Sequence, residues 1–198
     1  MSVNTVEHNR RRFSFEGIRE IWLFGYGSLI YKVDFPYLER RPAAIRGWAR
    51  RFWQGSHDHR GTPEAPGRVV TLIEAPGTEC RGMAYRVSPE VFEHLDEREK
   101  NGYLRFSTPM TFDDGTRAEG LVYIATPDNA AFLGDAPESA IAGQIARAHG
   151  PSGANADYLL QLADSLRALG DDCPHTFAIE AHLRPLLAES VSGNDPIR

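Results

Sequence analysis

The sequence has few cysteines and no long apolar segment. Its two cysteines, Cys80 and Cys173, form no CxxC pair, so their spacing supports neither a disulfide framework nor a zinc knuckle. No run of about 18 apolar residues occurs, as a membrane-spanning helix requires. The N-terminal segment also lacks the apolar core of a secretory signal. We therefore expect a cytoplasmic protein with free thiols and no membrane partner.

An excess of positive charge is also missing. The chain carries 22 Lys and Arg against 27 Asp and Glu, a formal net charge of -5. Binding to nucleic acid or to anionic lipid needs a surplus of basic residues on one face, so neither partner is expected. The hydrophobic share of 41% is that of an ordinary globular protein. The expected partner is a small molecule.

Strand patterns come first along the chain and helix patterns come last. Residues 1–20 are polar and aperiodic, which predicts a flexible arm, followed by one domain over 21–190 and a tail over 191–198. Apolar and β-branched runs between Gly and Pro predict strands over 21–25, 44–53, 68–74, 81–87, 103–112 and 117–125. Apolar periodicity and capping residues predict helices from 89 onward and over 137–149, 155–169 and 176–189. This order indicates an α+β fold.

Two glycines follow the first predicted strand, in the segment Gly25-Tyr26-Gly27-Ser28-Leu29. Such a turn exposes backbone N–H groups that can hold a carboxylate. A dinucleotide-binding GxGxxG would need a third glycine where Ile30 stands, and a GxSxG nucleophile elbow would need glycines in place of Tyr26 and Ile30. Neither motif fits, and a tight turn that merely ends a core strand remains open as an alternative.

One carboxylate continues the apolar stripe of the first predicted helix. Val91, Leu95 and Glu99 fall at i, i+4 and i+8, so Glu99 is expected to face inward. Removal of a carboxylate from water disfavours its charged form and raises its pKa toward values useful for proton transfer. The alternative is a solvent-exposed helix end at which Glu99 pairs with Arg98 or Lys100.

Other polar residues permit further interpretations. His57, Asp58 and His59 are types that bind metals, but no second ligand cluster supports them, so we expect no metal. Arg51 or Arg68 could contact a substrate carboxylate bidentately, and an internal ion pair explains either residue equally well.

Five segments, in this order, resemble the ChaC-like γ-glutamylcyclotransferases: FGYGSLIYKVDFPY, RRFWQGSHDHRGTPEAPGRVVTLIE, GMAYRV, LDEREKNGY and GPSGANADYLLQLADSLRALG. The match runs from about Ile21 to Leu187. The resemblance implies an α+β fold with a mixed barrel-like sheet and flanking, mostly C-terminal helices.

The resemblance also implies a site. In that family the YGSL loop holds the γ-glutamyl group and a glutamate of the LDxRE segment is the general acid-base, which corresponds to Glu99 here. The REKxGY segment has Asn101-Gly102 where the family often has two glycines, which affects the turn before the tyrosine. The implied substrate-binding residues are Leu23, Phe24, Gly25, Tyr26, Gly27, Ser28, Leu29 and Tyr103.

By the same resemblance the chain is an enzyme of glutathione degradation, a lyase that needs no cofactor. The α-amine of glutathione attacks its own γ-carbonyl and yields 5-oxoproline and Cys-Gly. A cyclotransferase for other γ-glutamyl dipeptides or γ-glutamylamines stays open, as does a non-catalytic γ-glutamyl-binding module, although Glu99 argues against the module because binding alone needs no base. Candidates for binding the Cys-Gly end are Arg51, Arg68 and Tyr158.

Overall fold

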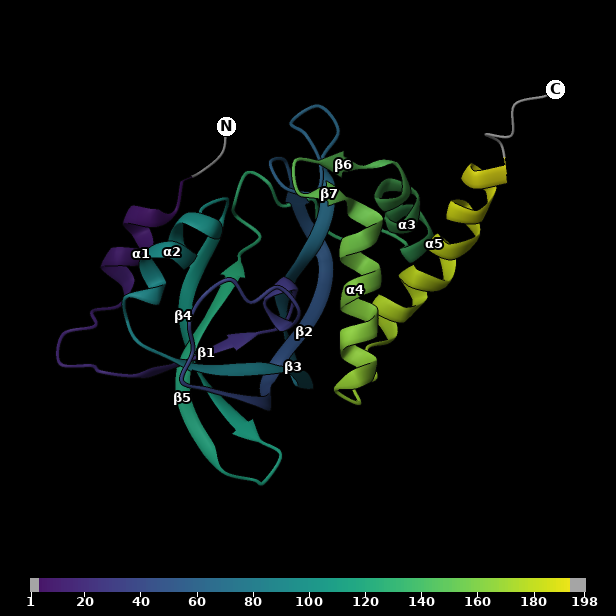
Figure 1. Ribbon diagram of the computed structural model, residues 1–198. Helices are drawn as coiled ribbons and strands as arrows, with labels where there is room; N and C mark the ends of the chain where they lie inside the picture. The colour runs from purple at the N-terminus through teal and green to yellow at the C-terminus, as the bar shows by residue number, and fades with distance from the viewer. Residues whose placement is uncertain (1–3, 193–198) are drawn as a thin grey trace.

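A closed barrel of five strands forms the centre of the protein (Figure 1). The computed structural model describes residues 4–192. The strands are β1 (Ile21–Gly25), β2 (Glu39–Ser56), β3 (Gly67–Val87), β4 (Tyr103–Phe112) and β5 (Arg117–Ala125). Their order around the barrel is β1-β3-β2-β4-β5. β1 pairs antiparallel with β3 and parallel with β5, and this short strand therefore closes the barrel.

Strands β2 and β3 form one long ribbon. The sequence predicts two strands over 68–74 and 81–87, whereas the structure has a single strand β3 that pairs with β2 from Glu39↔Arg86 to Ser56↔Gly67. Pro76 and Gly77 were the reason for predicting a break. Residues 75–78 of β3, which include Pro76 and Gly77, have no partner on β2, because the pairing steps from Arg46↔Glu79 to Trp48↔Glu74. A bulge of this kind accommodates both residue types within one strand.

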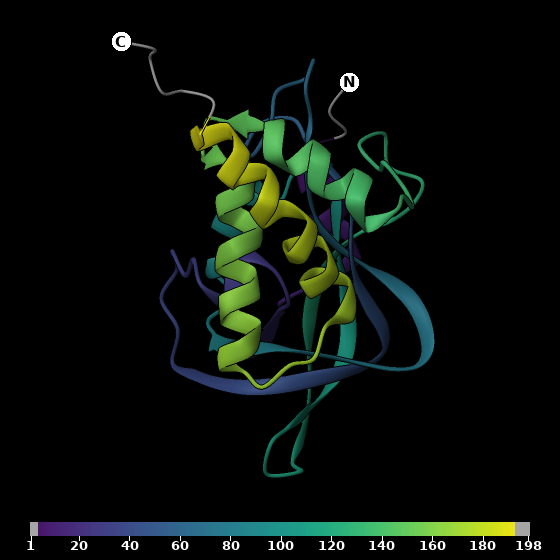
Figure 2. The same cartoon turned by 90° about the vertical axis from the view of Figure 1, so that its right-hand side faces the viewer.

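Helices cover the barrel on two sides (Figures 1 and 2). Three of them pack together beside the β2–β3 ribbon: α3 (Glu138–Arg147), α4 (Asn155–Ala168) and α5 (Pro174–Ser192). Helices α1 (Val6–Arg12) and α2 (Val91–Arg98) lie on the other side. The 3-10 helix η1 (Ser28–Ile30) follows β1, and the short strands β6 (His149–Gly150) and β7 (Gly153–Ala154) form a hairpin before α4. The predicted α+β architecture with mostly C-terminal helices is confirmed.

Helix α1 occupies the segment that the sequence predicts as a flexible arm. Val6 is buried, and the fully buried amide of Asn9 donates to Tyr103 O at 3.1 Å and accepts from Arg105 N at 2.8 Å. Hydrogen bonds between polar side chains of this segment and the backbone of β4 hold it in addition to apolar contacts, so it is ordered with few apolar residues. Of the predicted arm and tail, residues 1–3 and 193–198 lie outside the described part of the chain.

Asn155, the first residue of α4, connects this helix to strand β3. It begins α4, but the residue in the N-cap position is Ala154. The Asn155 side chain is completely buried, accepts a hydrogen bond from Arg68 N at 2.7 Å and donates one to Arg68 O at 2.9 Å. It therefore ties α4 to the start of β3, instead of capping its own helix.

Along residues 4–192, no helix is long and apolar enough to cross a membrane.

The core fills the barrel and continues under the helices. The β1 strand, the end of α2 and the inner face of α4 all contribute to one apolar cluster, which fixes the glycine loop relative to α2 and α4. Its largest fully buried side chains are Phe24, Phe52, Tyr85, Phe92, Leu23, Ile45, Leu72, Leu95, Met110, Leu121, Ile124 and Ile141.

Candidate active site

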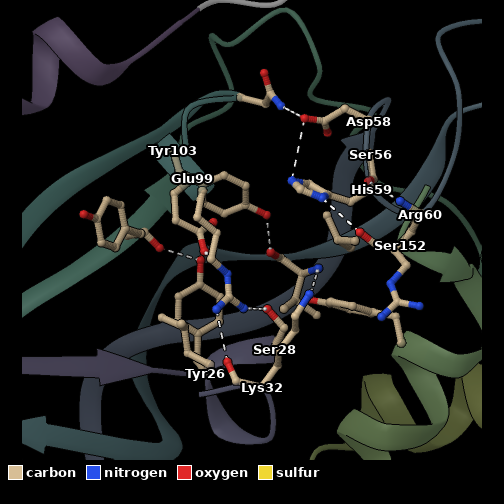
Figure 3. A pocket seen from close by; sticks show the side chains of 18 of the residues that line it. Tyr26, Ser28, Lys32, Ser56, Asp58, His59, Arg60, Glu99, Tyr103 and Ser152 are labelled. Carbon is tan, nitrogen blue, oxygen red and sulfur yellow. Dashed lines mark hydrogen bonds and ion pairs between the residues drawn. The ribbon is translucent and has the colours of Figure 1, made fainter. Parts of the chain in front are cut away.

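A cavity of about 280 Å³ lies where the loop after β1, the loop after β2 and the end of α2 meet (Figure 3). Pockets for small molecules are typically of this size or somewhat larger. Its lining includes Phe24, Tyr26, Gly27, Ser28, Leu29, Lys32, Asp34, Ser56, Asp58, His59, Arg60, Val70, Arg98, Glu99, Asn101, Tyr103, Tyr123, Ser152 and Tyr158. The cavity thus combines the glycine loop and the acidic segment, which are distant in the sequence.

Gly27 is required by close packing. A Cβ at this position would lie 2.7 Å from Val70 Cγ2 and 3.0 Å from Tyr158 Oη, closer than side chains normally approach. The lack of space for a side chain is therefore one reason for glycine at this position. The chain then turns into η1, and among residues 4–192 the N–H groups of Gly27, Ser28 and Leu29 have no hydrogen-bond acceptor. They are donors available to a ligand.

Glu99 is the residue that ends helix α2. Its N–H bonds Leu95 O at 2.8 Å, and Val91 and Leu95 before it on the same face are buried. The Glu99 side chain is 17% exposed and lines the cavity. Burial raises the pKa of this carboxyl above its ordinary value, and the neighbouring Arg98 charge opposes part of that rise. A carboxyl whose pKa is raised holds a proton more readily than an ordinary glutamate, which suits a group that must both accept and donate protons.

Arg98 connects α2 to the loop after β1. Its NH2 donates to Ser28 Oγ at 2.9 Å, and its NH1 contacts Asp34 Oδ1 at 2.6 Å and Lys32 O at 3.1 Å. Its Nε lies 3.5 Å from Glu99 Oε1. The alternative that Glu99 pairs with Arg98 therefore holds, but the pair faces the cavity rather than open solvent. This one guanidinium positions the glycine loop against the carboxylate.

Three tyrosines surround the carboxylate. Tyr26 Oη donates to Tyr123 O at 2.6 Å, Tyr103 Oη donates to Val70 O at 2.7 Å, and Tyr158 Oη accepts from Val70 N at 3.3 Å. Burial raises the pKa of Tyr26, Tyr103 and Tyr158, and the Glu99 charge adds to this, so all three stay neutral. The three uncharged tyrosines exclude water from the Glu99 carboxylate but supply no positive charge that would compensate its negative charge.

A buried arginine supports the glycine loop from behind. Arg50 Nε donates to Tyr26 O at 2.7 Å, and its NH1 pairs with Asp171 Oδ2 at 2.8 Å in the connection between α4 and α5. A third donor bonds Arg81 O. The Arg50 side chain is 2% exposed, and the pKa of this guanidinium is raised by nearby acidic groups, which outweigh the opposing effect of burial. The loop conformation therefore depends on a contact between β2 and the helical side of the molecule.

The predicted site residues divide into two groups. Phe24, Tyr26, Gly27, Ser28, Leu29, Glu99, Tyr103 and Tyr158 line the cavity, whereas Leu23 and Gly25 lie outside its lining. Leu23 is fully buried in the core, and a Cβ on Gly25 would lie 2.7 Å from Leu29 Cβ, so both support the loop.

Arg51 and Arg68 do not face the cavity, contrary to the sequence-based expectation. Arg51 NH1 donates to Arg50 O at 2.8 Å. Arg68 is buried, and its donors are used on Phe52 O, Gly134 O and Gln144 Oε1 at 3.0, 2.9 and 2.7 Å. Protein oxygens thus accept the hydrogen bonds of Arg68 and one hydrogen bond of Arg51, and neither residue belongs to the cavity lining.

Four charged lining residues were not assigned to the site by reasoning from the sequence: Lys32, Asp34, Arg60 and Arg98. Arg98 adjoins Glu99 in the acidic segment, which was the available signal for it; the others carried none. Asp58 and His59 also line the cavity, where Asp58 accepts a hydrogen bond from Asn101 and His59 Nδ1 lies 3.2 Å from Ser152 Oγ. Across the described residues, no group of three or more His, Cys, Asp or Glu side chains is arranged to hold a metal ion.

Comparison with known proteins identifies similar chains. The family profile described as "ChaC-like protein" matches residues 21–186. A "Gamma-glutamylcyclotransferase 2-3" of Arabidopsis thaliana is 44% identical, over 86% of this chain and 92% of that protein. A "Glutathione-specific gamma-glutamylcyclotransferase 1" of Danio rerio is 45% identical, over 86% of this chain and 94% of that protein.

A crystal structure of a similar protein has the same fold as this chain. The γ-glutamylcyclotransferase specific to glutathione from yeast superposes with a TM-score of 0.76 at 35% sequence identity. The match covers 83% of this chain and 96% of the yeast chain. The barrel and the helices around the cavity thus recur in a solved structure.

Proposed function

Because the chain belongs to the family of ChaC-like proteins, we propose that it is a γ-glutamylcyclotransferase that acts on glutathione. Relatives that match over most of their length carry this activity in their names. The observation that carries the proposal is the juxtaposition of Glu99, with its raised pKa, and the free N–H groups of the glycine loop in one cavity.

The reaction is an intramolecular amide exchange. The α-amine nitrogen of the γ-glutamyl residue forms a bond to the γ-carbonyl carbon, and the bond from that carbon to the cysteine nitrogen breaks. The products are 5-oxoproline and Cys-Gly. Amine and carbonyl are already in one molecule, and oriented intramolecular reactions can gain about 7–11 kcal/mol of barrier lowering. The enzyme has only to fold the substrate and move protons, so no protein nucleophile is required.

Glu99 is the proposed proton carrier. The α-amine is an ammonium at neutral pH, and Glu99 as carboxylate accepts a proton from it before attack. The protonated Glu99 then donates that proton to the departing cysteine nitrogen, and the restored carboxylate accepts the second proton that the attacking nitrogen loses as it becomes the lactam N–H. This second proton passes to the released amine of Cys-Gly, which leaves as an ammonium. Burial raises the pKa of Glu99, which brings both protonation states into reach within one catalytic cycle.

The glycine loop is the proposed holder of the γ-glutamyl end. In this proposal the N–H groups of Gly27 and Ser28, which have no acceptor among residues 4–192, donate to the substrate α-carboxylate. Arg98, bonded to Ser28 Oγ, adds a positive charge beside them. The hydroxyls of Tyr26 and Tyr103 are used on carbonyl oxygens, so the two rings are held rigidly as walls of the site. Tyr158 forms a further wall.

Turnover by wild type and Glu99→Gln tests the proposal. Both proteins are incubated with glutathione, γ-Glu-Ala and γ-Glu-ε-Lys, and mass spectrometry follows 5-oxoproline and the released amine. We expect release from glutathione by the wild type and a loss of at least about 100-fold in kcat for Glu99→Gln. The matched control is Glu97→Gln, whose carboxylate is 59% exposed on the solvent side of α2 and should be dispensable.

The Glu99→Gln protein is expected to stay folded. The pKa of Glu99 is raised in the folded state, so its favourable contribution to stability exists at low pH and is lost as pH rises through the folded pKa. A neutral amide is therefore tolerated at neutral pH. Normal turnover by Glu99→Gln would remove this residue from the mechanism, and turnover of only γ-Glu-Ala or γ-Glu-ε-Lys would reassign the substrate.

A further inference from the structure

Arg60 is a buried cation of the cavity that lacks an acidic partner. It is 9% exposed, and within the described residues its one side-chain hydrogen bond runs from NH1 to Ala154 O at 3.0 Å. The exposed carboxylate of Asp157, in the first turn of α4, is nearby, since its Oδ2 lies 4.0 Å and Arg60 NH1 3.3 Å from the Cβ position at Gly153, but the two side chains form no ion pair. Three other buried or nearly buried arginines have acidic partners: Arg50 with Asp171, Arg98 with Asp34, and Arg105 with Asp96. Arg68 is buried without an acidic partner too, but three protein oxygens accept its hydrogen bonds, whereas one does so for Arg60.

An unpaired guanidinium in such a position favours an anionic ligand. Partial burial removes water from the charge, and an anion that supplies hydrogen bonds restores the lost stabilisation. The planar group also presents donors that match a carboxylate bidentately. Lys32 is the other cation of the cavity without an ion pair among residues 4–192, but its side chain lies at the exposed rim.

The backbone around Arg60 is clamped before any ligand arrives. Arg60 N donates to Ser56 Oγ at 2.9 Å, and Ser152 N in the β6–β7 hairpin donates to His59 O at 2.9 Å. The hairpin approaches so closely that a Cβ on Gly150 would lie 2.3 Å from His59 O. A side chain anchored in this way loses little conformational entropy when it binds.

Tyr158 lies between Arg60 and the glycine loop and is close to both. The Arg60 Cζ lies 5.9 Å from the Tyr158 ring centroid, and Tyr158 Oη lies 3.0 Å from the Cβ position at Gly27. Figure 3 shows Glu99 and Arg60 on opposite sides of the cavity. A dipeptide in an extended conformation spans at most about 7 Å, which is comparable with the 5.9 Å between Arg60 Cζ and the centre of the Tyr158 ring. When the γ-glutamyl end is held at Gly27, the dipeptide that follows the γ-carbonyl extends along the Tyr158 ring, beside which Arg60 lies.

We propose that Arg60 binds the carboxylate at the C-terminal end of the leaving dipeptide, which is the glycine carboxylate of glutathione. The inference rests on the proposed function and names a determinant of its substrate class. Substrates with a carboxylate two residues after the γ-glutamyl group are preferred over those in which that charge is absent. Arg60 is a substrate-binding residue in this assignment, while Glu99 carries the protons.

A pair of substrates isolates the contact. Glutathione is compared with its glycine ethyl ester, which lacks the carboxylate, in wild type, Arg60→Gln and Arg60→Lys. We expect Arg60→Gln to raise KM for glutathione by about 10- to 100-fold with a smaller change in kcat, and Arg60→Lys to fall between. KM for the ester should be high and equal in wild type and Arg60→Gln. Arg51→Gln, an arginine outside the cavity, is the matched control and should leave both substrates unchanged.

The failure of this proposal differs from the failure of the proposed function. If Arg60→Gln leaves KM for glutathione unchanged, or weakens glutathione and its ester equally, Arg60 does not bind the carboxylate even though turnover continues. If the wild type releases no 5-oxoproline, the proposed function fails. Calorimetric binding of glutathione and its ester to Glu99→Gln, with and without Arg60→Gln, then decides Arg60 without turnover, and equal binding in the two backgrounds overturns the assignment.

Discussion

Arg98 Nε lies 3.5 Å from Oε1 of Glu99, the residue that follows it in the sequence. Two influences act in opposite directions on the pKa of Glu99: burial of its carboxyl raises it, and the Arg98 charge lowers it. The carboxyl can therefore be removed from water and still ionise. The same guanidinium bonds Ser28, so the loop contact and the proton affinity are coupled.

Replacement of Arg98 by Gln tests this coupling through the pH dependence of kcat/KM. In the wild type the acid limb should lie above the ordinary range of a glutamate, since the base must be ionised and its pKa is raised. Loss of the Arg98 charge removes the influence that lowers the pKa, so the limb should move to still higher pH. Below the limb, each unit of displacement lowers kcat/KM by about tenfold.

A neighbouring cation serves as the control for Arg98. Lys100 pairs with Glu97 at 3.6 Å on the exposed side of the helix end, and Lys100→Gln should leave the acid limb in place. A limb that stays fixed in Arg98→Gln, or that moves equally in Lys100→Gln, would contradict the specific role of Arg98.

Gly27→Ala should damage the site while leaving the fold intact. The added Cβ would lie 2.7 Å from Val70 Cγ2, and the stiff β-branched Val70 in β3 cannot easily yield, so the loop must move. We expect kcat/KM for glutathione to fall by about 10-fold or more. The comparison is Gly143→Ala in α3, where the nearest contact would be Arg147 NH1 at 3.5 Å and helix propensity predicts a gain of about 0.5–1 kcal/mol in stability. Wild-type kinetics for Gly27→Ala would show that the close approach is not needed.

Asp171→Ala should destabilise the whole protein. The change leaves Arg50 buried without its partner, and removal of one member of a buried pair typically costs about 3–5 kcal/mol. Urea unfolding followed by circular dichroism measures the loss. Glu79→Ala, which breaks the exposed pair between Glu79 and Arg46 at 3.5 Å, should cost less than about 1 kcal/mol. Similar losses in the two variants would mean that burial of the Arg50 pair has no energetic consequence.

Local pattern predicted the elements that carry the site. β1, β4 and β5 begin and end at the predicted residues, because alternation and Gly or Pro boundaries are properties of short segments. The stripe through Val91 and Leu95 correctly placed Glu99 beside the cavity, since helical spacing alone determines which face a residue shares. Patterns were less informative where distant segments intervene: β3 continues through Pro76 and Gly77 because β2 lies beside it.

The sequence by itself determined the α+β class, the position of the glycine loop after β1 and the identity of the inward carboxylate. Only the tertiary structure decided which arginines face the cavity. The partner of a guanidinium usually comes from a distant segment: Arg50 meets Asp171, 121 positions away, and Arg68 meets Gln144, 76 positions away. Arg60 and Arg98 face the cavity because of the loops packed around them, and no pattern within a short segment distinguishes them from Arg51 or Arg68.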